Sequence, residues 1–306
     1  MKKTVALFCV LALMLASFTA GMEYQRGDVD QDGSVDISDV TCLISYLLNG
    51  SWPEDPTTPQ IETYTVNGVS FNMVAVEGGT FMMGANDDDT LAYSSEYPAH
   101  EVTLTGYSIG QTEVTQELWL AVMGSNPSYH SSGYGFAEDL NRPVEYVSWK
   151  ECQTFISTLN DLTGKNFRLP TEAQWEFAAR GGVLSQGYLY AGSNNLEDVA
   201  WYYENSYGLG VSSPDYDTHA VATKAPNELG LYDMSGNVNE WVQDWFGFYG
   251  GFVSGPETDP TGPRSGYHRV YRGGCTYSWN EDCRVSFRYQ ENADNRSTAI
   301  GLRLAL

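Results

Sequence analysis

The sequence predicts an α+β protein that is irregular and rich in loops. Short runs of β-branched and aromatic residues lie between glycines at 79–84, 101–110 and 268–274, which is typical of short strands. The 31 glycines and 12 prolines indicate many turns. Two segments with helical spacing lie between these strands, so the fold mixes both kinds of element.

Capping residues and apolar spacing predict the two helices. In RLPTEAQWEFAAR (168–180), Thr171 and Gln174 form a capping box, and Trp175, Ala178 and Ala179 share one face of a short buried helix. Residues 150–164 have four apolar side chains at helical spacing: Cys152, Phe155, Ile156 and Leu159. Cys152 is therefore expected to be a buried core thiol and not a metal ligand.

Length and charge limit the classes of partner. A chain of 306 residues with 42% hydrophobic content can bury one large core beside a smaller module. The 39 acidic and 16 basic residues give a net charge of −23. Phosphate binding needs clustered Lys and Arg, so nucleic acids and anionic membrane surfaces are not expected partners. Excess carboxylates suit calcium, or keep a secreted protein soluble.

Residues 1–21 have the features of a secretory signal peptide. A basic start precedes an apolar run from Val5 to about Phe18, and small residues follow at 19–21. The run is short for a membrane span, so we expect cleavage rather than a retained anchor. We therefore expect a protein that is secreted or held at the cell surface or in the periplasm. No cysteine follows the run as in a lipoprotein, and four cysteines remain in an oxidising compartment.

An acidic loop with ligand spacing lies within residues 22–50. Counted from position one, carboxylates fall at positions one, three, five, nine and twelve: Asp28, Asp30, Asp32, Asp36 and Asp39. Gly33 stands at the sharp turn, and Ser34 offers its backbone carbonyl. Such spacing surrounds one hard cation with oxygen, so we predict calcium. An acidic solvated loop would explain the charge but neither the spacing nor the glycine.

The acidic loop is followed by a helix with an apolar face: Val40, Leu43, Ile44, Leu47 and Leu48. This loop-helix pattern resembles a type I dockerin repeat. Dockerins that bind cohesins carry two repeats, and the chain has no second copy. Two hypotheses stay open: a cohesin-like partner, or a calcium-stabilised helix that packs on the main domain or on a neighbour. Residues 51–63 are expected to be a stiff linker.

Ordered motifs run from residue 64 to the last residue. They are MVAVEGGTFMMG (73–84), EYPAHEVTLTGYSIGQTEVT (96–115), PVEYVSW (143–149), FRLPTEAQWEFAARGG (167–182), NELGLYDMSGNVNEW (227–241), RVYRGG (269–274) and GLRLAL (301–306). Residues 64–306 resemble the formylglycine-generating enzyme family, also called sulfatase-modifying factor domains. The resemblance implies a C-type-lectin-like fold.

The resemblance also implies formylglycine generation, but this chain lacks the two cysteines on which that activity depends in the family. Catalytic members oxidise a substrate cysteine with molecular oxygen at Cu(I), which two thiolates hold because soft sulfur selects that ion. Ser278 stands at the position of the first of these cysteines, and the second has no counterpart in the shortened segment. We therefore expect neither copper as a cofactor nor formylglycine generation.

Cys275 and Cys283 leave alternatives open. Cys283 aligns with a family cysteine that is structural in some members, where its disulfide partner stands at the position of Ala179. With that partner absent, a local Cys275–Cys283 disulfide is expected in an oxidising compartment. Two free thiols are one alternative. A displaced copper pair in an oxidoreductase of sulfatase maturation is the other.

In the family, the turn that matches YDMSGNVNEW (232–241) binds a structural calcium. The resemblance implies side-chain and backbone oxygen ligands at four positions: Asp233, Gly236, Val238 and Glu240. A metal-free turn with Glu240 bonded to backbone amides is the alternative. Asn239 replaces the usual tryptophan, which alters packing but keeps the oxygen donors.

No other catalytic constellation is present in the sequence. The four histidines are scattered without ligand spacing, so a structural role is expected for each: His100, His130, His219 and His268. The chain has no GxSxG elbow, phosphate loop or HExxH motif.

We therefore expect a non-catalytic extracellular protein that binds a protein or a glycan. Its recognition face is predicted between Gly274 and Gly301, with these residues: Tyr277, Ser278, Trp279, Asn280, Phe287, Tyr289, Gln290, Asn292, Asn295 and Arg296. Tyr, Asn and Arg give adaptable contacts at low entropic cost, as in antibody paratopes. An ordinary polar loop is the alternative. The same segment resembles the variable region of diversity-generating retroelement proteins, so a diversified face is a further hypothesis.

Overall fold

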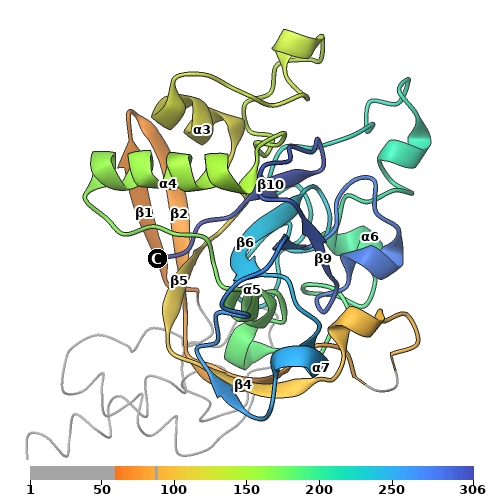
Figure 1. Ribbon diagram of the computed structural model, residues 1–306. Coiled ribbons are helices and arrows are strands. Elements are labelled where there is room, and N and C mark those ends of the chain that lie inside the picture. The colour runs from red at the N-terminus through yellow and green to blue at the C-terminus, as the bar shows by residue number, and fades with distance from the viewer. Residues whose placement is uncertain (1–58, 87–88) are drawn as a thin grey trace, which may run out of the picture. The chain divides into compact units, whose positions relative to one another are not determined.

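The computed structural model describes residues 59–86 and 89–306 (Figure 1). The predicted signal peptide, the acidic loop and residues 51–58 of the predicted linker lie outside the described residues. The chain divides into two units, 1–58 and 59–306. Residues 61–63, which the sequence assigned to the linker, form the first half of a paired strand, so the domain begins before residue 64.

Short strands form three small sheets in the described residues. The strands are β1 (Ile61–Val66), β2 (Val69–Val76), β3 (Gly79–Met83), β4 (His100–Leu104), β5 (Tyr107–Gly110), β6 (Asn239–Trp245), β7 (Glu257–Thr258), β8 (Arg269–Arg272), β9 (Arg288–Glu291) and β10 (Ile300–Leu302). Their orders are β1-β2-β5, β3-β4-β7 and β10-β6-β8-β9. Most neighbours are antiparallel, but β10 pairs with β6, and β4 with β7, in parallel.

The α-helices are α3 (Gln116–Met123), α4 (Trp149–Thr163), α5 (Glu172–Ala179), α6 (Leu196–Val199) and α7 (Tyr249–Phe252). Short 3-10 turns add η1 (Ser94–Glu96), η2 (Ser132–Tyr134), η3 (Gly182–Leu184), η4 (Tyr207–Leu209) and η5 (Asn280–Cys283). Within the described part of the chain, none of the helices is long and apolar enough to cross a bilayer. Mixed short elements joined by long loops confirm the predicted fold class.

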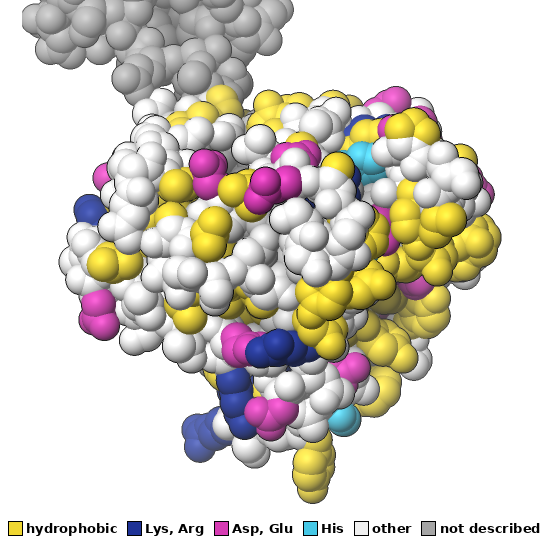
Figure 2. All heavy atoms as spheres, turned by 90° about the horizontal axis from the view of Figure 1, so that it is seen from above, with side chains coloured by type: hydrophobic (Ala, Val, Ile, Leu, Met, Phe, Trp, Pro, Cys, Tyr) yellow, Lys and Arg dark blue, Asp and Glu magenta, His cyan; other side chains and the backbone are white. Residues whose placement is uncertain are grey.

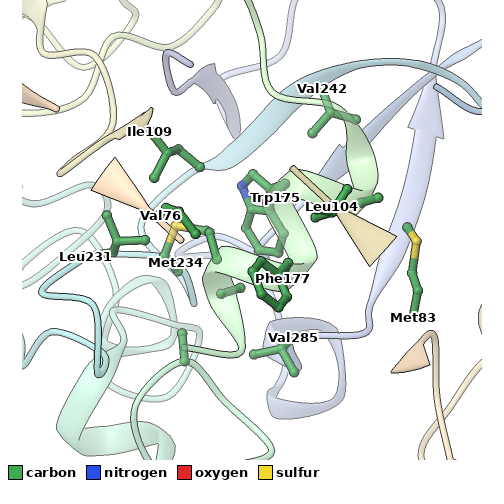
Figure 3. Close-up of a cluster of buried hydrophobic side chains, with 14 of the residues drawn as sticks. Val76, Met83, Leu104, Ile109, Trp175, Phe177, Leu231, Met234, Val242 and Val285 are labelled. Carbon is green, nitrogen blue, oxygen red and sulfur yellow. The ribbon is translucent and has the colours of Figure 1, made fainter. Parts of the chain in front are cut away.

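Helix α5 lies at the centre of the larger core. Thr171 Oγ1 accepts a hydrogen bond from the backbone N of Gln174, and Gln174 Oε1 accepts one from the N of Thr171, which confirms the capping box. Every residue of α5 is buried. Figure 3 shows Trp175 and Phe177 among side chains from β2, β3, β4 and β5 and from the segments that follow α6. The predicted short buried helix is therefore confirmed.

A second core lies under α3 and α4, which pack on the β1-β2-β5 sheet (Figure 1). The four predicted apolar residues of α4 all face this core: Cys152, Phe155, Ile156 and Leu159. Trp119 of α3 stacks on Phe155 with ring centroids 4.7 Å apart. Cys152 is fully buried, as predicted.

Four fully buried arginines connect the elements: Arg272, Arg284, Arg288 and Arg303. Each of them pairs with at least one buried carboxylate: Arg272 with Glu172 and Glu176, Arg284 with Glu96, Arg288 with Glu172, and Arg303 with Glu240. A buried charge is tolerated only when it is paired and hydrogen-bonded, so these pairs fix how the loops pack on α5 and β6.

Candidate functional site

Ser278 lies in the loop between β8 and β9, beside Cys275. The Ser278 hydroxyl accepts a hydrogen bond from the backbone N of Cys275 at 3.1 Å and lies 3.5 Å from the Cys275 sulfur. The backbone N of Tyr203 donates to the carbonyl of Ser278 at 2.9 Å. This bond ties the β8–β9 loop to the long loop that precedes β6.

Cys275 and Cys283 are free thiols in the structure, which contradicts the predicted disulfide. The Cys275 sulfur faces the Ser278 hydroxyl, and Cys283 packs with Tyr190, Leu196 and Val199, but the two thiols are near enough for Cys275 to raise the pKa of Cys283. Both cysteines are buried, and burial raises the pKa of each thiol. A raised pKa disfavours the thiolate, which is the form that reacts with alkylating reagents.

Three loops contribute eight aromatic rings in two contact groups, which are linked through His130, and Ser278 lies between two of the rings in sequence. They come from the segments α3–α4 (Tyr129, Tyr134 and Phe136), α6–β6 (Tyr203, Tyr207 and Tyr216) and β8–β9 (Tyr277 and Trp279), and we call this set the aromatic face. Tyr203 and Trp279 have centroids 4.2 Å apart, and Tyr207 and Tyr277 4.4 Å. The exposed rings are Tyr134 at 58%, Trp279 at 47%, Tyr129 at 40% and Tyr207 at 37%.

The loops α3–α4 and α6–β6 rise at the top of the domain in Figure 1, and Figure 2 looks down on that side. Hydrophobic and aromatic side chains gather along one edge of this view, while Lys and Arg are few there. A large exposed apolar patch is typical of an interaction site.

His130 joins the three loops through buried polar contacts. Its Nε2 lies 2.5 Å from Asp217 Oδ2, and its Nδ1 lies 3.4 Å from Glu145 Oε1. The Tyr277 hydroxyl donates to Asp217 Oδ2 at 3.0 Å, so one carboxylate holds the α3–α4 and β8–β9 loops. Asp217 has a φ of +76°, which is uncommon for a residue with a side chain. Its Oδ1 accepts from the backbone N of Thr218.

The environment of His130 favours the charged imidazolium. Burial lowers the pKa of His130, but hydrogen bonds and charge from Asp217 and Glu145 outweigh this and raise the pKa to about 9. Burial raises the pKa of Glu145. A cation fixed between two carboxylates explains why these loops, which lack regular structure, pack in one arrangement. This is the structural role predicted for His130.

The turn at 232–241 holds Glu240 in a buried ion pair. Glu240 Oε1 accepts from Arg303 Nη2 at 2.7 Å, and Oε2 accepts from Arg303 Nε at 3.0 Å and from Trp175 Nε1 at 2.6 Å. Asp233 differs from Glu240, since its Oδ2 accepts from the backbone N of Ala222 but its Oδ1 is buried without a partner. Burial raises the pKa of Asp233 to about 6.

These contacts test the fit of a calcium ion at this turn. Asp233 fits a ligand because one buried oxygen lacks a hydrogen bond, whereas both oxygens of Glu240 are committed to Arg303. Among the residues that the structure describes, no three His, Cys, Asp or Glu side chains are grouped to hold a metal. Calcium at Asp233, Gly236, Val238 and Glu240 therefore stays a prediction, and the free oxygen of Asp233 is the contact that favours it.

Comparison with known proteins identifies the domain. Residues 58–306 match the family described as "Sulfatase-modifying factor enzyme 1-like domain". The chain belongs to the sulfatase-modifying factor family. Residues 26–67 match the dockerin type I domain, which agrees with the predicted loop-helix resemblance. The dockerin match overlaps the start of the sulfatase-modifying factor domain, including β1.

Relatives of this sulfatase-modifying factor protein have several names. A chaperone protein LppX of Paenibacillus barcinonensis is 34% identical over 77% of this chain and 89% of its own length. A formylglycine-generating enzyme of Thermomonospora curvata is 28% identical over 78% of this chain and 94% of the enzyme. Among solved structures, Treponema denticola variable protein 1 has a TM-score of 0.70 and 34% identity, covering 81% of this chain and 99% of that one.

The predicted recognition residues of the sulfatase-modifying factor domain fall into three groups. Tyr277, Ser278 and Trp279 lie in the aromatic face, and Asn280 follows at the start of η5. Phe287 and Tyr289 stack at 6.3 Å, and Tyr93 contacts Phe287, in a second aromatic group. Gln290 pairs with β8. Asn292 and Asn295 form hydrogen bonds within their own loop, to Asp294 and Glu291, and Arg296 ties that loop to Glu151 of α4.

Sequence reasoning missed most of the aromatic face and its polar support. The segments SYHSSGYGF (128–136) and WYYENSYGLG (201–210) combine aromatic residues with Gly, Ser and Asn and have no helical or strand period. That composition is typical of binding loops. It could have indicated both segments, but nothing in the sequence indicated that they would meet Tyr277.

The two thiols give a direct test of the corrected assignment. We expect iodoacetamide to leave Cys275 and Cys283 unlabelled in the folded protein at neutral pH, because both are buried and protonated. After unfolding in denaturant without reductant, both should be labelled, which peptide mass spectrometry would show. If the two cysteines of the unfolded chain are labelled only after reductant is added, the predicted disulfide is present after all.

Proposed function

We propose that this sulfatase-modifying factor protein binds a partner through the aromatic face and does not generate formylglycine. The observation that carries the proposal is Ser278. It stands where the family's resemblance places a copper cysteine, and it lies in sequence between Tyr277 and Trp279 of the aromatic face. A serine oxygen is a poor ligand for Cu(I).

The remaining cysteines do not supply a substitute pair. The Cys275 sulfur faces the Ser278 hydroxyl, and Cys283 packs in the cluster with Leu196 and Val199. Their raised pKa values keep sulfur in the thiol form at neutral pH. Rigid aromatic side chains instead offer large contact areas at low entropic cost, which suits binding.

We expect no aldehyde when reduced, copper-loaded protein is incubated with a peptide that carries the sulfatase motif CxPxR. Mass spectrometry of the substrate cysteine measures this. Ser278→Cys combined with Cys275→Ser should also stay inactive, because it leaves no second sulfur beside position 278. An aldehyde that appears with the wild type and disappears with Cys275→Ser would contradict the proposal and move the active site to Cys275.

A diversified binding face is a second candidate function. The likeness to Treponema denticola variable protein 1, over nearly all of that chain, favours it. The residues open to diversification would be exposed ones such as Trp279 and Tyr289, since buried Arg284 and Arg288 hold the fold. A near-duplicate DNA repeat that differs at adenines, beside a reverse transcriptase gene, would support this candidate, and a genome without either would exclude it.

We further propose that the protein is exported and uses calcium. The acidic loop supplies five carboxylates at ligand spacing: Asp28, Asp30, Asp32, Asp36 and Asp39. Export would place the dockerin-like segment outside the cytoplasm, where a cohesin-like partner could bind it. Detection of the full chain outside the cells tests export, and a pull-down with a cohesin domain tests the partner.

We expect calcium to raise the melting temperature of the full chain. A ligand that binds only the folded state adds about 2.7 kcal/mol at a hundredfold excess over its Kd. Differential scanning calorimetry with calcium and with chelator measures the shift. Asp30→Asn combined with Asp32→Asn should remove the contribution of the acidic loop, and Asp233→Asn that of the turn. Identical melting with calcium and chelator would contradict the prediction.

A further inference from the structure

We propose that the partner of the aromatic face is cationic, namely a segment of another protein that carries several arginine or lysine side chains. This inference rests on the proposed binding function and adds the chemistry of the partner. It follows from two features that coincide on this face, exposed rings and carboxylates for which the described residues provide no ion pair.

Carboxylates accompany the rings on the same loops. Glu138 lies two residues after Phe136, Glu204 directly follows Tyr203, and Asp215 directly precedes Tyr216. All three of these carboxylates are exposed: Glu138, Glu204 and Asp215. The ring of Tyr216 contacts the ring of Tyr207 with centroids 5.2 Å apart, so Asp215 is next in sequence to a ring of the aromatic face.

Positive charge near the aromatic face is already neutralised. Arg142 lies 4.0 Å from Asp139, and Arg296 forms a bidentate pair with Glu151. His130 is buried between two carboxylates. The face therefore has a negative potential that no exposed, unpaired cation of these loops offsets within the described residues.

Most cations elsewhere on the described surface are also paired with carboxylates. Lys150 pairs with Asp294 at 2.6 Å, Lys224 with Glu197 at 3.4 Å, and Arg180 with Glu176 at 2.7 Å. The chain carries a net charge of −23. A field of one sign attracts oppositely charged partners and accelerates their association. A neutral glycan would use the rings but would gain nothing from these carboxylates.

Aromatic rings add specificity for a cation. A guanidinium or ammonium group over a tyrosine or tryptophan face gains roughly 0.5–2 kcal/mol. This domain already uses the interaction internally, because the Arg269 guanidinium lies 3.9 Å from the ring centroid of Trp149 and 3.5 Å from that of Trp245. Trp279 and Tyr207 present exposed rings for the same contact.

The test is a titration of the full chain with a peptide of alternating arginine and glycine, followed by calorimetry at low and high salt. We expect Trp279→Ala combined with Tyr207→Ala to weaken binding about tenfold, equivalent to about 1.4 kcal/mol. Tyr267→Ala is the control for the ring substitutions, because Tyr267 is 92% exposed and lies outside the aromatic face. It should bind as the wild type does.

A second matched pair tests the charges. Glu204→Gln with Asp215→Asn should weaken binding and its salt dependence, whereas Glu62→Gln with Glu101→Gln removes equal charge from exposed positions on β1 and β4 and should have little effect. Equal losses in both pairs would mean non-specific attraction and would overturn the inference.

A neutral glucan is the other probe. Suppose that the glucan binds and that Trp279→Ala removes this binding, while the arginine–glycine peptide binds the wild type and all the variants equally. This result would overturn the cationic partner but keep the proposed binding function. Formation of aldehyde in the separate peptide assay would overturn the proposed function itself. The two failures are therefore distinguishable.

Discussion

Replacing Arg303 with methionine is expected to destabilise the protein by about 3–5 kcal/mol, because breaking a buried ion pair leaves an unpaired charge. Arg303 is fully buried and binds both oxygens of Glu240. It also donates to the carbonyls of Gly110 and Tyr232. Burial together with the charges of Asp233 and Glu240 already raises the pKa of Glu113 well above its usual value. Without Arg303, these carboxylates would have no cation.

Urea unfolding measures this loss, and Arg296→Met is the matched control. Arg296 is exposed and pairs with Glu151 at the surface, where an ion pair contributes about 0–1 kcal/mol. A midpoint for Arg303→Met within the range of the control would show that the buried pair does not hold β10 to β6. If the variant does not accumulate in folded form, Glu240→Gln, which removes the charge and one of the two accepting oxygens but keeps the side-chain shape, gives the graded comparison.

Stability is expected to fall by on the order of 3 kcal/mol as the pH rises from 6.5 to 9, because His130 loses its proton between these values. The folded pKa of His130 is raised from 6.5 to about 9. A raised pKa means that the folded state binds the proton more tightly, so the contribution is complete below pH 6.5 and is lost as the pH passes 9. The buried Glu145 has a raised pKa and contributes with the same sign.

Denaturation at several pH values checks this slope. His130→Gln should remove most of it and should also weaken binding at the aromatic face, because Asp217 and Glu145 would then lie near each other without a cation between them. His268→Gln, in the segment that enters β8, should keep the slope. A slope that is the same in both variants would assign the pH dependence to other groups.

Sequence alone determined the features that depend on residues close together in the chain. The capping box of Thr171 and Gln174, the apolar face of α4 and the spacing of the acidic loop are all local, and local signals are readable without a structure. The motifs that identify the sulfatase-modifying factor family are equally local. So is the serine at position 278, on which the prediction of no copper pair depends.

The tertiary structure decided which side chains meet. Tyr277 and His130 are 147 residues apart, and Tyr277 and Asp217 are 60 apart, so no sequence period could place them together. The same reason explains the correction at the cysteines and the ion pair at Glu240. Cys275 faces Ser278 while Cys283 turns into the cluster with Leu196, and Glu240 is held by Arg303, 63 residues away. Partners of buried polar groups are chosen by packing, because each must find hydrogen bonds wherever the fold brings them.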